Sequence, residues 1–128
     1  MSLRRALPVA ALVVAVWAVL PPYVGPGVHV PASREVADHV VPAAVLVAVS
    51  AAALFLVPKL ARPGPFLFLA GLVITLAGIW MVATHVPLVA QAGRHEVSGL
   101  AAAHHSLPGV AVLVLGLVWS ATWWSEAS

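Results

Sequence analysis

Residues 66–90 read FLFLAGLVITLAGIWMVATHVPLVA, a run of 25 residues without an acidic side chain, a lysine or an arginine. A helix needs about 20 mostly apolar residues to cross a hydrocarbon core roughly 30 Å thick. The stretch therefore predicts a transmembrane helix. Gly71 and Gly78 are seven residues apart within it and His85 repeats that spacing, so all three are expected near one face of the helix.

Three other stretches have the same apolar character, and segments that carry proline or glycine and most of the charge separate them. Residues 1–128 are therefore predicted to be a single all-α integral membrane domain, an antiparallel bundle of four transmembrane helices. The first stretch could instead be a cleaved signal peptide, but no clear small-x-small site precedes Pro21, which favours a retained helix. The three stretches are about Ala6–Val24, Asp38–Pro58 and Gly99–Trp124.

The composition excludes several classes of protein. The chain is 62% hydrophobic and 8% charged, whereas soluble domains are nearer half apolar and a quarter charged. The basic pI rests on a net charge of only +2 with no basic run, which argues against nucleic-acid binding. The absence of cysteine excludes disulfides and thiolate metal sites. Five arginines against one lysine, with no asparagine, favour a GC-rich prokaryotic genome.

The two ends of the predicted bundle differ in charge. Cationic side chains in short loops favour the cytoplasmic side, and four of six lie at the end that holds both termini. This bias predicts cytoplasmic termini in a multi-pass protein of the plasma membrane, with the lipid bilayer as its main partner. Trp119, Trp123 and Trp124 are expected in the interfacial belt at the same end. The four cations are Arg4, Arg5, Lys59 and Arg62, against Arg34 and Arg94 at the other end.

The sequence resembles itself when it is shifted by 66 residues. Gly27–His29 then aligns with Gly93–His95, and His39–Pro42 aligns with His105–Pro108. The shared pattern predicts two duplicated helical hairpins, about 6–58 and 66–124, related by an axis along the membrane normal. The alternative is coincidence, because apolar letters match by chance in a chain rich in alanine, valine and proline.

Histidines carry the candidate chemistry, and all six are expected on the extracytoplasmic side. Counting along the helices at 1.5 Å per residue places His39, His85 and His105 at one level, about 30 Å from the cytoplasmic boundary. Ionisable groups in membrane helices usually face the bundle interior, and neutral imidazole binds Zn, Cu or haem iron. These three are therefore the predicted cofactor ligands, with His39 and His105 related by the duplication.

Small residues on the third and fourth helices indicate how these helices pack. Gly109 and Gly116 lie on the fourth helix, and His105 is one turn before Gly109. Glycines let membrane helices approach closely, so the two glycine faces are expected to meet. Antiparallel pairing then places the following residues opposite one another: Gly71 and Gly116, Gly78 and Gly109, and His85 and Ala102.

The other histidines are weaker candidate metal ligands. His29 and His95 form a second symmetric pair on the outer loops, although a lone histidine there is more often an interfacial residue. His104 is rotated about 100° from His105 and is expected to face another neighbour or the lipid headgroups. Met81, one turn below His85, could offer a thioether to copper or haem iron, but packing is the favoured interpretation.

Three acidic residues flank the histidine layer. Glu35, Asp38 and Glu96 could accept hydrogen bonds from the imidazoles and orient them. For Asp38 the favoured interpretation is an N-cap of the second helix, with Pro42 in its first turn.

Two classes of function fit this pattern. The first is electron transfer or metal handling at the extracytoplasmic face, with haem b in a slot between the second and fourth helices, or with a Cu or Zn ion. The second is a non-catalytic accessory subunit of a larger membrane complex, such as an oxidase or transporter. A small channel or transporter that works as a homodimer is disfavoured, because the cytoplasmic two-thirds of each helix lacks ionisable residues. Phosphate-loop, nucleophile-elbow and paired-carboxylate motifs are missing, which argues against an enzyme.

Overall fold

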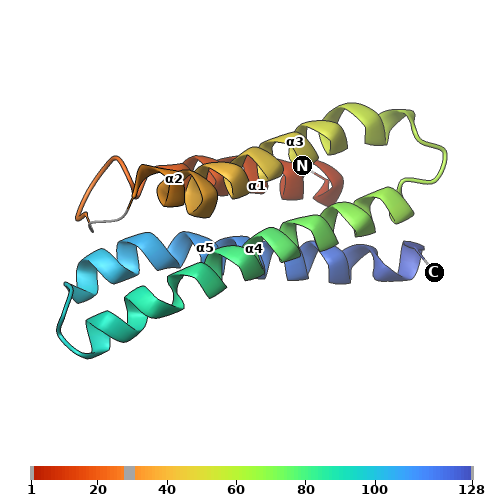
Figure 1. Ribbon diagram of the computed structural model, residues 1–128. Helices are drawn as coiled ribbons and strands as arrows, with labels where there is room; N and C mark the ends of the chain where they lie inside the picture. Colours follow the sequence, from red (N-terminus) through yellow and green to blue (C-terminus); the bar gives the residue numbers. More distant parts are fainter. Residues whose placement is uncertain (1, 28–30, 128) are drawn as a thin grey trace.

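The computed structural model describes residues 2–27 and 31–127, and all of its regular structure is helical (Figure 1). The helices run antiparallel, so that both termini and the connection between α3 and α4 lie at one end of the bundle. The four main helices are α1 (Leu3–Val19), α3 (Val41–Leu56), α4 (Gly64–Gly93) and α5 (Gly99–Ala127). Three short elements join them: α2 (Ala32–Glu35), the π-helical turn η1 (Val36–Val40) and the 3-10 turn η2 (Val57–Lys59).

The helices pack around the bundle in a fixed order. The most extensive packing is between α4 and α5. Helix α1 packs on α3 and on α5, and α3 also packs on α4. As a result, α3 and α5 lie diagonally across the bundle. The prediction of a helical bundle with four main helices is confirmed, and the second and fourth of them face each other across its interior rather than pack side by side.

Three of the helical segments in the described part of the chain are long and apolar enough to cross a membrane: Ala32–Lys59, Gly64–Gly93 and Gly99–Trp124. Helix α1 has 17 residues, or about 26 Å at 1.5 Å per residue. The prediction that it extends to Val24 is wrong, because it ends at Val19. Pro21 and Pro22 lack the N–H donors that would continue the hydrogen bonds of the helix.

The second long segment begins earlier than predicted. Helical structure starts at Ala32, six residues before Asp38, so the N-cap interpretation of Asp38 is wrong. Asp38 lies inside η1 and is buried. Pro42 explains why the helix does not run through this point with regular α geometry: it has no N–H to donate to the Asp38 carbonyl, and its ring would clash there.

The π turn changes which backbone groups are paired. The N–H of Val41 bonds to the carbonyl of Val36, five residues back, instead of the Ala37 carbonyl that an α-helix would use. Trp80 of α4 donates its indole N–H to the Ala37 carbonyl, with the nitrogen and oxygen 3.2 Å apart. Helix α4 thus satisfies a backbone group that the π turn releases.

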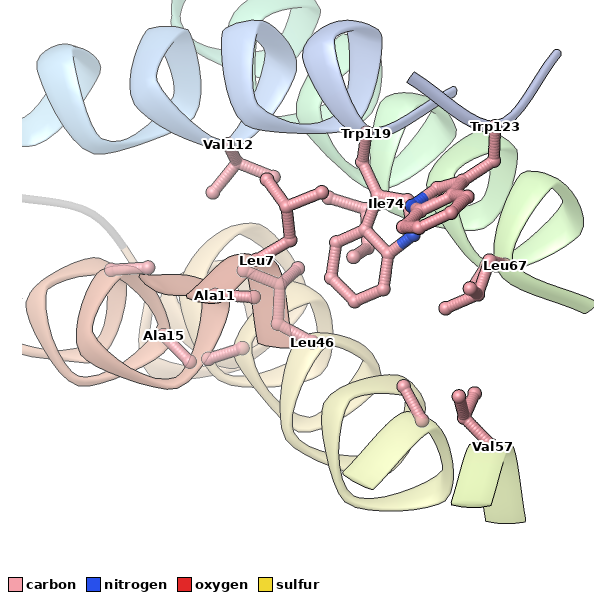
Figure 2. Close-up of a cluster of buried hydrophobic side chains, with 14 of the residues drawn as sticks. Leu7, Ala11, Ala15, Leu46, Val57, Leu67, Ile74, Val112, Trp119 and Trp123 are labelled. Atoms are coloured by element: carbon pink, nitrogen blue, oxygen red, sulfur yellow. The ribbon is translucent and has the colours of Figure 1, made fainter. Parts of the chain in front are cut away.

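The bundle interior is filled by one continuous apolar core (Figure 2). Leu46, Leu67 and Ile74 are fully buried there. Trp119 is fully buried and Trp123 is 5% exposed, so the prediction that both belong to the interfacial belt is wrong. Their spacing of four residues puts both rings on the inner face of α5, whereas Trp124 points outward.

Helices α4 and α5 approach closely at their glycines, but in a different register from the one predicted. A Cβ atom on Gly71 would lie 2.6 Å from the backbone nitrogen of Ser120, and one on Gly78 would overlap the backbone of Leu113. The expected facing of Gly71 with Gly116 and of Gly78 with Gly109 is therefore wrong by about one turn. Glycine facing glycine would leave a void, whereas a larger residue fills the notch and preserves dense packing.

Candidate metal centre

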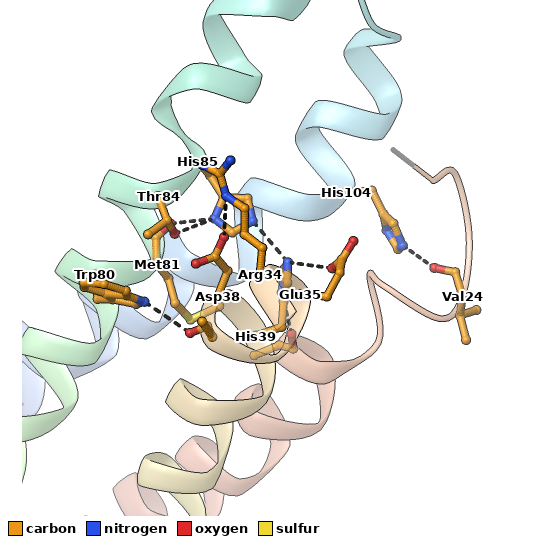
Figure 3. Close-up of polar contacts among 12 residues, drawn as sticks. Val24, Arg34, Glu35, Asp38, His39, Trp80, Met81, Thr84, His85 and His104 are labelled. Atoms are coloured by element: carbon orange, nitrogen blue, oxygen red, sulfur yellow. Dashed lines mark hydrogen bonds and ion pairs between the residues drawn. The ribbon is translucent and has the colours of Figure 1, made fainter. Parts of the chain in front are cut away.

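Three histidines from three different elements converge inside the bundle, and Figure 3 shows two of them, His39 and His85, pointing toward each other. His39 comes from η1, His85 from α4 and His105 from α5. Each offers a ring nitrogen, and the three nitrogens lie within 4.8 Å of one another. The side chains are buried, with residue exposures of 1%, 6% and 2%. The α4–α5 register also brings His85 beside His105, closer than the predicted position opposite Ala102.

Backbone carbonyls fix two of these rings. His39 Nδ1 lies 2.9 Å from the carbonyl oxygen of Ala18 in α1. His85 Nδ1 lies 2.6 Å from the carbonyl oxygen of Met81, one turn earlier in α4. A carbonyl oxygen can only accept a hydrogen bond, so each Nδ1 must carry the proton. The hydroxyl of Thr84 donates to the same Met81 carbonyl, at 3.1 Å.

This assignment leaves two lone pairs facing each other. In a neutral imidazole with a proton on Nδ1, Nε2 is the acceptor. The Nε2 atoms of His39 and His85 are 3.1 Å apart, so two acceptors meet at hydrogen-bond distance with no proton to share. His105 adds a third nitrogen, because its Nε2 is buried and has no hydrogen-bond partner. Such a convergence of lone pairs is unfavourable unless a cation or a hydrogen-bond donor lies among them.

The spacing of the closest pair of ring nitrogens suits a metal ion. Zinc binds histidine nitrogen at about 2.0–2.1 Å in tetrahedral sites, so two such ligands are about 3.3 Å apart. The separation of 3.1 Å between the Nε2 atoms of His39 and His85 is close to that value. The His39 ring is steeply inclined to both other rings, at 76° to His85 and 75° to His105. The three ring nitrogens are spread over up to 4.8 Å, so a single ion would require His105 to move closer to the other two rings.

Nothing in the geometry of the described residues points to haem. The Nε2 atoms of His39 and His85 are 3.1 Å apart, and the cavity beside the three rings, about 80 Å³ in volume, has room for an ion and small ligands.

The cavity extends from the three histidines to charged side chains at the same end of the bundle. Its lining includes Arg34, Glu35 and Asp38. Glu35 Oε2 is 4.0 Å from His39 Nε2, and Arg34 Nε is 3.6 Å from Asp38 Oδ2. Glu35 thus lies on the Nε2 side of the His39 ring, whereas the orienting role expected of a carboxylate at Nδ1 is filled by the Ala18 carbonyl.

Of the other predicted metal ligands, His104 lies beside the cluster, with its ring 5.8 Å from that of His105, His95 lies away from the cluster, and one falls outside the described residues. His104 contacts the Val24 carbonyl through Nε2. His95 is exposed in the turn after α4, with a φ of 60°. Its neighbour Glu96 pairs with Arg94 at 2.6 Å and raises the pKa of that guanidinium. His29 lies in the segment 28–30, which is not described.

Met81 contributes through its backbone. Its side chain is fully buried in the core, as the packing interpretation predicts, and its carbonyl orients His85. Sequence reasoning did not find the carbonyls of Ala18 and Met81, because every residue has a carbonyl and no side-chain pattern marks the ones that matter. The π turn did leave a signal, namely Pro42 three residues after His39.

Comparisons with protein-family models, curated proteins and solved structures find no match to this chain. The interpretation of the site therefore rests on its geometry. The structure supports a helical protein with candidate membrane spans and a buried cluster of three histidines that could hold a metal ion.

Proposed function

We propose that this protein is a metal-handling membrane protein whose His39, His85 and His105 bind one first-row divalent ion, Zn²⁺ or Cu²⁺. The observation that carries the proposal is the facing pair of Nε2 atoms on His39 and His85, 3.1 Å apart. Both Nδ1 atoms are held by carbonyl oxygens, so neither ring can donate to the other while both stay neutral.

A shared proton is the competing explanation. It would make His39 or His85 an imidazolium, and it would serve only two of the three nitrogens. The buried Nε2 of His105 would still have no partner, at a cost of about 1–3 kcal/mol for an unsatisfied buried group. A metal ion takes all three lone pairs without charging any ring. Imidazole suits both zinc and copper.

The proposed topology places this centre at the extracytoplasmic face of the plasma membrane. All four main helices cross the bilayer and both termini are cytoplasmic, following the distribution of cations. Helix α1, at about 26 Å, is a few ångströms short, and a bilayer adapts to such a mismatch at modest cost. The proposed duplication makes His39 and His105 equivalent ligands of the two hairpins, with His85 an addition of the second.

Metal analysis of the full-length chain in mild detergent tests the proposal. We expect about one ion per chain after dialysis against limiting Zn²⁺ or Cu²⁺, measured by elemental analysis together with an absorption spectrum. His39→Ala and His105→Ala should each abolish stoichiometric binding. His104→Ala is the matched control, since it removes the adjacent imidazole that contacts Val24, and it should bind like the wild type.

Two results would overturn the proposal. A folded wild-type chain that binds neither ion would exclude the metal centre, and a Soret band would show haem instead. The alternative function, an accessory subunit of a larger membrane complex, stays a prediction. A membrane partner that copurifies at fixed stoichiometry with both the wild type and His39→Ala would support it.

A further inference from the structure

Glu35 is the carboxylate nearest to the metal-binding side of the histidine cluster. It precedes His39 by four residues, so the two side chains lie on neighbouring positions of one helical face. Its Oε2 atom is 4.0 Å from His39 Nε2, the nitrogen that carries the free lone pair. The Glu35 side chain is 14% exposed, and it lines the same cavity as His39, His85 and His105.

The charges around Glu35 leave its carboxylate available. Arg34, the neighbouring cation, is paired with Asp38 at 3.6 Å. Among the described residues, Glu35 pairs with His39 at 4.0 Å, and that ring is neutral in the tautomer fixed by the Ala18 carbonyl. A mostly buried carboxylate beside a neutral acceptor nitrogen is unfavourable without a cation. A cation between the Glu35 carboxylate and the Nε2 atom of His39 would therefore stabilise both groups.

We infer that Glu35 is the fourth ligand of the proposed metal ion, completing a set of three imidazoles and one carboxylate. The inference rests on the proposed function. Ligand atoms about 2.0–2.2 Å from one zinc ion in tetrahedral geometry are about 3.3–3.5 Å apart. Glu35 Oε2 is 4.0 Å from His39 Nε2, so a shift of less than about 1 Å would bring this pair of atoms to ligand spacing, and the carboxylate would also have to turn towards His85 and His105.

Three neutral imidazoles and one carboxylate favour a divalent ion over a monovalent one. One carboxylate with three neutral imidazoles leaves a bound divalent ion with a net charge of +1, which is less costly to bury than +2. Carboxylate oxygen is a hard ligand, whereas monovalent copper prefers thiolate and thioether. The site should therefore prefer Zn²⁺ to Cu⁺, and Co²⁺ can replace zinc as a spectroscopic probe.

Titration of the full-length chain with Zn²⁺ and with Co²⁺ tests the role of Glu35. Glu35→Gln keeps the size of the side chain and removes the charge. We expect its Zn²⁺ affinity to fall at least as much as the roughly 10–100-fold typical for loss of an outer-shell partner, and the visible Co²⁺ spectrum to shift. Asp38→Asn is the matched control: it removes a carboxylate from the same cavity, one that is paired with Arg34, and it should change the Zn²⁺ affinity less than threefold.

The outcomes separate this inference from the proposed function. If Glu35→Gln binds Zn²⁺ with wild-type affinity and an unchanged Co²⁺ spectrum while His105→Ala does not bind, the metal centre stands and the fourth ligand is another group. Equal losses in Glu35→Gln and Asp38→Asn would indicate a general electrostatic effect and would also overturn the assignment. A wild-type chain that binds no metal overturns both.

Discussion

The hydrogen bond from His39 Nδ1 to the Ala18 carbonyl determines what the other nitrogen of that ring can do. Histidines that bind metals usually donate their second N–H to a carbonyl or carboxylate, which fixes the tautomer and the ring direction. His39 and His85 both show this arrangement before any ion is considered. Because the two acceptors are backbone atoms of helices, the rings are oriented by the fold itself.

A second contact at the scale of single residues is the hydrogen bond from the Trp80 indole to the Ala37 carbonyl in η1, the turn that carries His39. Trp80→Phe removes the donor to the Ala37 carbonyl and keeps an aromatic ring facing the lipid. We expect a loss of about 1 kcal/mol in the free energy of unfolding, the typical net value of one hydrogen bond. Zn²⁺ affinity should also weaken, because η1 carries His39. Thermal unfolding in detergent and Zn²⁺ titration measure the two effects.

Trp17→Phe provides the control for this prediction. Trp17 is also partly exposed on the bundle surface, and no hydrogen bond of its indole is found among the described residues. Its replacement should leave both the unfolding temperature and the Zn²⁺ affinity unchanged. Equal effects of the two substitutions would mean that the contact with Ala37 has no special importance.

At the scale of elements, the close approach of α4 and α5 sets the distance between His85 and His105. Gly78→Ala places a methyl group against the backbone of Leu113, and backbone cannot rotate away as a side chain can. We expect overpacking to lower the free energy of unfolding by about 1–3 kcal/mol. Zn²⁺ affinity should fall as well, since the helices must separate two turns below His85. Thermal unfolding and Zn²⁺ titration together measure this.

Gly99→Ala is the comparison, because a Cβ at that position meets nothing within 4 Å. Alanine also has the higher helix propensity, by about 1 kcal/mol in a helix interior, so this variant should be as stable as the wild type or slightly more so. If Gly78→Ala behaves in the same way, the glycine notch does not control the spacing of the histidines.

The same pair of helices shows what sequence reasoning could and could not predict. The spacing of Gly71, Gly78 and His85 placed them on the inner face of α4, and all three are buried there. The axial register of α5 was wrong by one turn, because pattern alone pairs small residues with small residues. Packing instead seats Leu113 and Ser120 in the glycine notches, and that choice depends on the shapes of both helices together.

The histidine layer was predictable for a related reason. Counting residues from the apolar boundary gives depth along each helix, so the common level of His39, His85 and His105 followed from sequence. The tautomers did not, because they depend on which carbonyls lie beside each ring. The π turn also rotates His39 relative to α3, and a regular 3.6-residue period does not include that rotation.

At the scale of the whole molecule, the proposed orientation can be tested directly because the chain contains no cysteine. A single cysteine at Ala61 lies in the connection between α3 and α4, and one at Ser98 lies between α4 and α5; both positions are exposed. We expect a membrane-impermeant maleimide to label Ser98→Cys in intact cells and to label Ala61→Cys only after lysis. The reverse pattern would place the termini and the histidine cluster on the opposite sides.

The origin of the three histidines has a mechanical consequence. His39 belongs to the first helical hairpin, while His85 and His105 belong to the second, and the chain links the two hairpins at the far end of the bundle through the connection after α3. An ion bound by these rings would link the two hairpins at the histidine end of the bundle, where the chain itself does not connect them. The two hairpins would then separate at this end when the ion leaves and close when it returns, which would couple occupancy of the site to the shape of the histidine end of the bundle.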